Sequence, residues 1–162
     1  FPPCAAHSRT GLQEPGIAEL PSGVLYAYAR TDLYCQYESF SADNLASWSP
    51  AQPSKFTSPC SPLSIRQNPY TGEYFAVWNP VPNYFGRYVA PKTAGRTPLV
   101  LARSQNGRDF SAPFVLEDDP AKGFCYPSLF FPDANTLLLS YCYGGEEDGG
   151  FLNCLKILRI SL

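Results

Sequence analysis

The sequence is poor in charge, and it contains no long apolar run. Charged residues make up only 16% of the 162 residues and hydrophobic residues 44%, so neither a disordered segment nor a coiled coil is expected. No stretch approaches the roughly 18 apolar residues that a transmembrane helix requires, and no signal-peptide pattern opens the chain. We therefore expect no association with a membrane.

Basic patches and metal-binding motifs are also lacking. The net charge is −2 and the basic residues are dispersed, so binding to nucleic acid or to anionic lipid is not expected. The six cysteines form no CxxC pair, and the only histidine is His7. Because zinc ligands occur at close, regular spacings, neither a metal site nor a cofactor is expected. The even number of cysteines is compatible with disulfides or with ordinary buried thiols, so the redox compartment and the localisation stay open.

Turn residues, in contrast, are abundant. Twelve glycines and 17 prolines are scattered between short apolar runs, a pattern typical of an all-β protein with many tight turns. Three segments repeat one arrangement, in which two apolar strands flank a proline-containing turn: residues 16–29, 63–78 and 128–141. Their spacing along the chain matches the size of a propeller blade.

Two turns that follow the first two hairpins are themselves alike. The shared positions are Ser41, Asp43 and Trp48 in the first turn and Ser104, Asn106 and Phe110 in the second. Serine and Asx side chains hydrogen-bond the turn backbone, and an aromatic side chain anchors such a turn against its sheet. We therefore interpret these turns as structural and not as a binding site.

The repeat predicts an all-β chain of about three four-stranded blades, which is half of a six-bladed β-propeller. Residues 1–162 form one partial propeller in this interpretation, with blades at roughly 11–55, 60–117 and 123–162. Propellers close with about four to eight blades, and an open half-ring leaves strand edges and an apolar face in water. We therefore expect a partner, either a missing N-terminal half or a second copy of the chain. Because the sequence begins with Phe1, we also expect that it was processed or cut from a longer chain.

The two turns resemble the Asp-box of the sialidase (neuraminidase) or BNR-repeat superfamily, and the likeness extends over roughly residues 12–145. In its order of features the chain is similar to the C-terminal half of a six-bladed sialidase-like propeller. The resemblance implies four site residues. Tyr126 matches the nucleophilic tyrosine and Glu14 the carboxylate that activates it, while Arg30 and Arg96 match two of the three arginines that hold the substrate carboxylate.

These residue types suit a sialic acid, which carries a carboxylate on its anomeric carbon. An anionic nucleophile would be repelled there, whereas a tyrosine deprotonated by a nearby glutamate can attack. Arginine binds the carboxylate through a planar, bidentate fork that lysine cannot reproduce. The resemblance thus implies a retaining exo-glycoside hydrolase that acts on sialic acid or another acidic sugar of a glycan. Its acid/base aspartate and first arginine would lie in preceding blades, so we expect the isolated chain to be inactive.

Two alternatives remain open. A non-catalytic sialidase-like propeller would bind glycan or protein through the same cleft without a competent acid/base pair. A glycosidase of another specificity, on a five-bladed propeller, would require paired carboxylates about 5–10 Å apart. The sequence offers no obvious second carboxylate to pair with Glu14.

Overall fold

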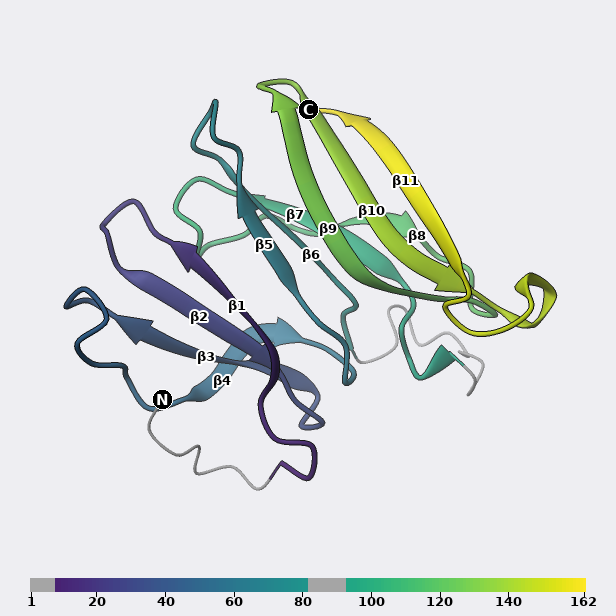
Figure 1. The fold of residues 1–162 in the computed structure, drawn as a ribbon, viewed down its shortest axis with the longest axis horizontal. Coiled ribbons are helices and arrows are strands. Elements are labelled where there is room, and N and C mark those ends of the chain that lie inside the picture. The colour runs from purple at the N-terminus through teal and green to yellow at the C-terminus, as the bar shows by residue number, and fades with distance from the viewer. Residues whose placement is uncertain (1–7, 82–92) are drawn as a thin grey trace.

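The computed structural model describes residues 8–81 and 93–162, which form three antiparallel β-sheets (Figure 1). The first sheet contains, in spatial order, β1 (Gln13–Glu19), β2 (Leu25–Arg30), β3 (Cys35–Ser41) and β4 (Gln52–Thr57). The second contains β5 (Ser64–Gln67), β6 (Tyr74–Trp78), β7 (Leu99–Ser104) and β8 (Phe114–Glu117). The third contains β9 (Gly123–Asp133), β10 (Thr136–Gly144) and β11 (Cys154–Ser161), and a short 3₁₀ turn, η3 (Glu146–Asp148), precedes β11.

The all-β, partial propeller fold is confirmed, and the three predicted hairpins are β1–β2, β5–β6 and β9–β10. The third sheet has three strands within the described residues rather than four, because one strand, β11, follows its hairpin. Cys4 and His7 lie outside the described residues. In the described part of the chain, no helix is long and apolar enough to cross a membrane.

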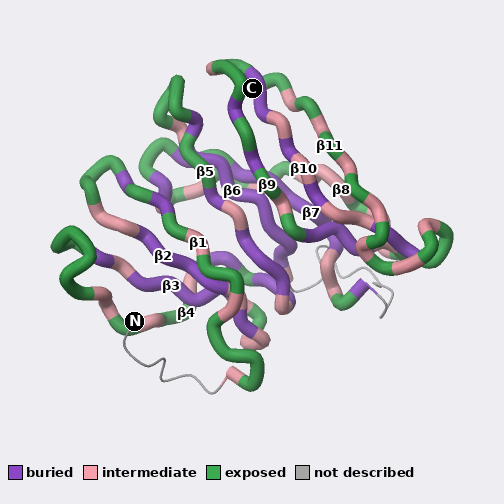
Figure 2. The backbone as a smooth tube through the Cα atoms, viewed as in Figure 1, coloured by how far each residue is buried: buried purple, intermediate pink, exposed green. Residues whose placement is uncertain are grey.

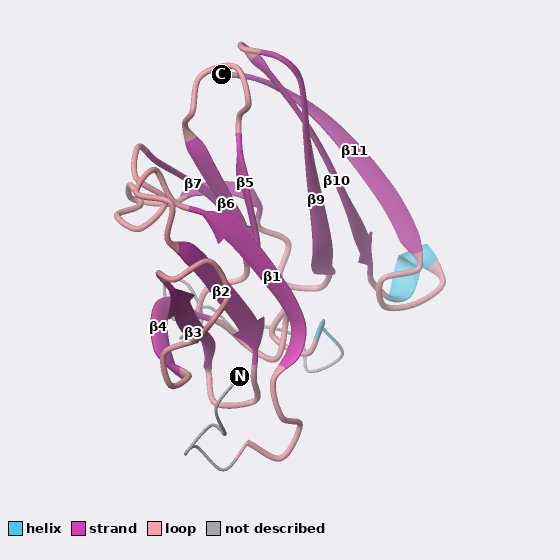
Figure 3. Cartoon of the chain, turned by 60° about the vertical axis from the view of Figure 1, so that its left-hand side comes forward, coloured by secondary structure: helices cyan, strands magenta, loops and turns pink. Residues whose placement is uncertain are grey.

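The three sheets are arranged around their first strands. The second sheet lies between the first and the third (Figure 1, Figure 3), and β5 contacts β1 on one side and β9 on the other. This is the radial order of propeller blades, in which the first strand of each blade is innermost. This arrangement places β1, β5 and β9, which are distant in sequence, side by side.

The core consists of two layers of side chains, one on each face of the second sheet. Along β6, Tyr74, Ala76 and Trp78 pack against the first sheet, while Phe75 and Val77 pack against the third. Every residue of β6 is therefore buried (Figure 2). A continuous apolar run is the sequence pattern expected of a strand that is covered on both faces.

The two Asp-box-like turns form the local hydrogen bonds that their sequences predict. Ser41 Oγ lies 3.0 Å from Asp43 Oδ1, and the Asp43 carboxylate accepts a backbone N–H at 2.9 Å. Ser104 Oγ accepts a backbone N–H at 2.9 Å in the second turn. Phe110 packs edge-on against Phe56, with ring centroids 5.2 Å apart, which anchors the second turn to the core between the first two sheets.

The third sheet leaves one face uncovered within the described structure. Phe130, Leu155 and Ile157 are 62, 67 and 65% exposed, and the strand register places them on the same face, opposite the second sheet. Figure 2 shows the resulting alternation of exposed and half-buried residues along β11. We call these residues, with Leu138, the outer face of the third sheet. Such an apolar face is the feature expected of an open half-ring.

Replacing Leu139 by alanine should destabilise the fold strongly, because its fully buried side chain packs in the layer between the second and third sheets. We expect a loss of about 2–5 kcal/mol in the free energy of unfolding, measured by urea denaturation. The matched control is Ile157→Ala on the adjacent strand, which is mostly exposed and should cost less than about 1 kcal/mol. Equal losses in the two variants would contradict the placement of the core.

Candidate active site

Two of the three innermost strands carry the same irregularity, a β-bulge that contains a proline. The register of β1 against β2 slips between Gln13 and Gly16, so Glu14 and Pro15 stand opposite a single residue. The register of β9 against β10 slips between positions 125 and 128, so that Tyr126 takes the equivalent place. Bulges of this kind re-aim side chains and are over-represented beside active sites.

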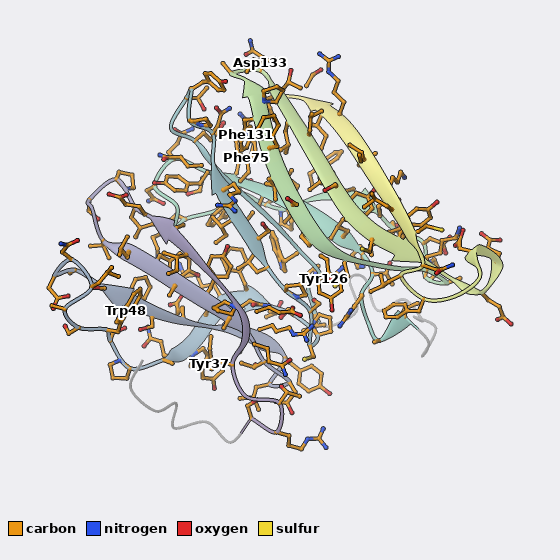
Figure 4. All side chains as sticks on the ribbon, viewed as in Figure 1. Tyr37, Trp48, Phe75, Tyr126, Phe131 and Asp133 are labelled. Carbon is orange, nitrogen blue, oxygen red and sulfur yellow. The ribbon has the colours of Figure 1, made fainter. Side chains whose placement is uncertain are left out.

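Both residues that precede the bulge prolines have left-handed backbone conformations. The φ angle is +49° at Glu14 and +58° at Tyr126, a region that non-glycine residues seldom adopt. The two side chains consequently leave the regular alternation of their strands. Glu14 and Tyr126 line one cleft of about 520 Å³, together with Pro15 and Pro127. Figure 4 shows Tyr126 in the region where the three sheets come together.

Arg30 ends β2 directly beside the first bulge. Its Nε and Nη2 atoms donate to Gln13 Oε1 at 3.1 and 2.9 Å, and Nη1 lies 3.2 Å from Glu14 Oε2. Nη1 also donates to the Cys60 carbonyl oxygen at 3.4 Å. The Arg30 side chain is only 13% exposed, whereas that of Glu14 is 38% exposed. The guanidinium is thus held in place from three sides, while the carboxylate stays accessible from the cleft.

Arg96 approaches the same point from the loop before β7. Its Nη2 atom donates to the Cys60 carbonyl oxygen at 3.1 Å, so the two arginines share one acceptor. Its guanidinium lies over the Tyr126 ring at 5.4 Å and over the Phe151 ring at 5.6 Å from the centroids, within the range of cation–π contacts. The Nε atom is buried and has no hydrogen-bond partner among the described residues.

The Arg96 loop is tied directly to β9. The backbone N–H of Phe124, two residues before Tyr126, donates to the Arg96 carbonyl at 2.7 Å. Buried Asn79 then bridges the two segments, because its side-chain amide donates to the carbonyls of Pro98 and Phe124 at 2.9 and 3.1 Å. The position of Arg96 relative to Tyr126 is therefore set by backbone contacts and does not depend on long side chains alone.

The four residues predicted from the resemblance thus form one contiguous cluster. Three further participants were not predicted: Gln13, Cys60 and Phe151. Cys60 contributes only its backbone carbonyl, which any residue type supplies, so its side chain carried no signal. Phe151 comes from the loop after β10, and only the folded chain brings it to Arg96. Gln13 was detectable in principle as the neighbour of Glu14, but its amide has no feature that distinguishes it in sequence.

The cluster contains more positive than negative charge. Two permanent cations, Arg30 and Arg96, meet with one contacting carboxylate, Glu14, so the cluster is suited to bind an anion. Burial raises the pKa of the neighbouring Cys125 thiol to about 11, although Arg96 acts in the opposite direction. That thiol is consequently neutral near pH 7. Among residues 8–81 and 93–162, no group of three His, Cys, Asp or Glu residues is placed to hold a metal ion.

The sheet arrangement and the propeller order of the strands define a partial β-propeller of the sialidase type. The family model of the BNR repeat-like domain matches residues 5–137, and the chain belongs to this family. No match was found among curated proteins.

Two solved structures illustrate the likeness in fold. The intramolecular trans-sialidase from Ruminococcus gnavus, in complex with oseltamivir carboxylate, matches with a TM-score of 0.65 at 19% identity, over 92% of this chain and 32% of the enzyme. The alpha-L-arabinanase from Penicillium chrysogenum, complexed with arabinobiose, matches with a TM-score of 0.53 at 14% identity, over 90% of this chain and 44% of the enzyme. The chain therefore spans less than half of either protein. It shares the propeller fold of these two proteins.

Replacing Gly16 by alanine should disturb the first bulge, because a Cβ atom there would overlap the Tyr28 ring. Tyr28 is buried, and its hydroxyl oxygen accepts the backbone N–H of Ile65 at 2.9 Å, a link between the first two sheets. We expect Gly16→Ala to lower the free energy of unfolding by about 1–3 kcal/mol in urea denaturation. In a Tyr28→Ala background the same change should cost less than about 1 kcal/mol. An identical cost in both backgrounds would show that the ring is not the obstacle.

Proposed function

We propose that the chain is the C-terminal half of a sialidase-like, retaining exo-glycoside hydrolase whose substrate is sialic acid or another acidic sugar of a glycan. In this proposal Tyr126 is the nucleophile and Glu14 activates it, while Arg30 and Arg96 hold the carboxylate of the substrate. The observation that supports it best is the convergence of these four side chains, from the first sheet, the third sheet and the loop before β7, on one region.

The charges of the cluster favour an anionic substrate. Each arginine presents a planar fork, and only part of their hydrogen-bonding capacity is used by Gln13, Glu14 and the Cys60 carbonyl. A bound carboxylate would supply the missing acceptors and place the adjacent anomeric carbon near Tyr126, the positioning contribution to catalysis. The family membership and the trans-sialidase neighbour, whose bound ligand is named as a carboxylate, are in line with this reading.

The same geometry favours tyrosine over a carboxylate as the nucleophile. Glu14 is the only carboxylate among the described residues that line the cleft, whereas most glycosidases use two. The Arg96 guanidinium lies over the Tyr126 ring. A cation at this place stabilises the negative charge that develops on the phenol when Glu14 takes its proton.

The proposed reaction also needs an acid/base aspartate and a third arginine, which are not assigned among the described residues. We propose that these come from a missing N-terminal propeller half, which would also cover the outer face of the third sheet. A second copy of the chain is the alternative partner at that face. The exposed Phe130, Leu155 and Ile157 side chains support a protein partner at this face. A non-catalytic propeller that binds glycan or protein through the same cleft is the alternative function.

Substituting Tyr126 by phenylalanine tests the proposed chemistry. When the complementary half is present, a fluorogenic sialoside should be cleaved, and Tyr126→Phe should reduce kcat by about 10³-fold or more, because the nucleophilic oxygen is lost. The matched control is Tyr34→Phe, which alters a 73% exposed tyrosine outside the cleft and should leave turnover unchanged. Full activity of Tyr126→Phe would refute the role of Tyr126. Sugar binding in calorimetry without any turnover by the unmodified protein would establish the non-catalytic alternative.

Light scattering on the chain by itself tests the partner. If two half-rings build a ring, the solution mass should be twice that of the monomer, and Ile157→Asp should convert the dimer to monomer by placing a charge on the outer face of the third sheet. Gln52→Asp, at an exposed position of β4 in the first sheet, serves as the control for added negative charge away from this face. A dimer that cleaves the sialoside would show that no catalytic group is missing, contrary to our proposal. A monomer without turnover would indicate that the complementary half is a different segment.

A further inference from the structure

Two cysteines of the third sheet lie directly opposite each other. Cys125 in β9 and Cys142 in β10 are partners in the antiparallel register. Opposite residues of such a pair project to the same side of the sheet, with Cα atoms about 4.5 or 5.5 Å apart. Both separations fall within the roughly 4.4–6.8 Å that a disulfide requires. No other two cysteines of the described residues are partners in a strand register.

The two thiols differ in their access to solvent. Cys125 is completely buried, whereas Cys142 is half-buried and is therefore the more exposed of the two. Cys154 lies nearby in β11 but stands opposite Tyr143, one position beyond Cys142. Because neighbouring positions of a strand project to opposite faces, Cys154 and Cys142 point away from each other. The register therefore selects one pair among the three cysteines of this sheet.

We propose that Cys125 and Cys142 form a cross-strand disulfide that fixes β9 to β10 at the residue before Tyr126. Both cysteines are thiols in the structure. With oxidised glutathione as the oxidant, the Cys142 thiolate attacks one glutathione sulfur, and a glutathione thiolate leaves. The Cys125 thiolate then attacks the Cys142 sulfur of this mixed disulfide, and the second glutathione thiolate leaves. The two cysteines lose two protons and two electrons, and one glutathione disulfide is reduced to two thiols.

The order of these steps follows from the surroundings of the two thiols. The attacking species is the thiolate, and burial raises the pKa of Cys125 to about 11, so this side chain is seldom deprotonated near pH 7. The more exposed Cys142 should therefore react first, and closure of the ring by Cys125 should be the slow step.

The location gives the bond a structural consequence at the candidate site. The bulge that contains Tyr126 and Pro127 begins at the residue after Cys125. A covalent link at position 125 prevents the register from slipping at one end of this bulge, and thereby makes Cys125 a positioning residue for Tyr126. The existence of the disulfide does not depend on the proposed enzymatic activity, because it rests on the strand register alone.

The test equilibrates the full chain with a mixture of oxidised and reduced glutathione, blocks the remaining thiols and maps the peptides by mass spectrometry. We expect one linked pair of peptides, containing Cys125 and Cys142, whose joint mass is lower by two hydrogens than that of the separate thiols. Alkylation of both cysteines after equilibration in the oxidising mixture, or linkage of Cys125 to a different cysteine, would overturn the proposal.

Variants give an independent readout through thermal stability. Addition of a reductant should lower the Tm of the oxidised chain by roughly 5 °C or more, because the bond joins residues that are 17 positions apart and so closes a loop. Cys142→Ser should abolish this response, and the control Cys154→Ser, in the adjacent strand, should keep it. An unchanged response in Cys142→Ser would also refute the proposed pairing, and the peptide map of the unmodified chain decides the question if a variant fails to fold.

Discussion

The packing of both faces of the second sheet is the interaction on which the rest of the structure depends. Residues of β6 alternate between the two apolar layers, so that Tyr74 and Trp78 pack toward the first sheet and Phe75 and Val77 toward the third. Since each sheet must cover its neighbour, β1, β5 and β9 are brought side by side. A site made of residues more than a hundred positions apart in sequence, such as Glu14 and Tyr126, exists only because of this stacking.

The two proline-containing bulges direct side chains of β1 and β9 into the cleft. In a regular β1 or β9, alternate side chains would point into one apolar layer, where a carboxylate is costly to bury, or onto the opposite face of the sheet. Left-handed backbone at Glu14 and Tyr126 turns both side chains toward the cleft instead. Such conformations cost of the order of 1–3 kcal/mol each and persist where the surrounding structure imposes them. The same backbone device occurs in the first and third sheets and places both side chains at one cleft.

The sequence predicted the elements that depend on local chemistry and missed those that depend on tertiary contacts. Proline turns and apolar runs located the three hairpins, and Ser41 and Asp43 revealed a self-contained turn because its hydrogen bonds are local. The candidate site was predictable only through a family resemblance, since Arg96 alone is indistinguishable from a surface charge. Its contacts with the Cys60 carbonyl and the Phe151 ring arise between loops that only folding brings together. The number of strands in the third sheet was likewise beyond local reasoning, because it depends on pairing between distant segments.

In the proposed function, the open outer face of the third sheet and the incompleteness of the catalytic set have a common origin. A propeller distributes its functional residues over the inner strands of successive blades, so a half-ring that lacks blades lacks catalytic groups and covering surface at once. Phe130, Leu155 and Ile157 are exposed on the face that a further blade would cover. In the proposal, completion of the ring would cover the outer face of the third sheet and add the further catalytic groups at the same time. The proposed assembly and the proposed activity should therefore be coupled.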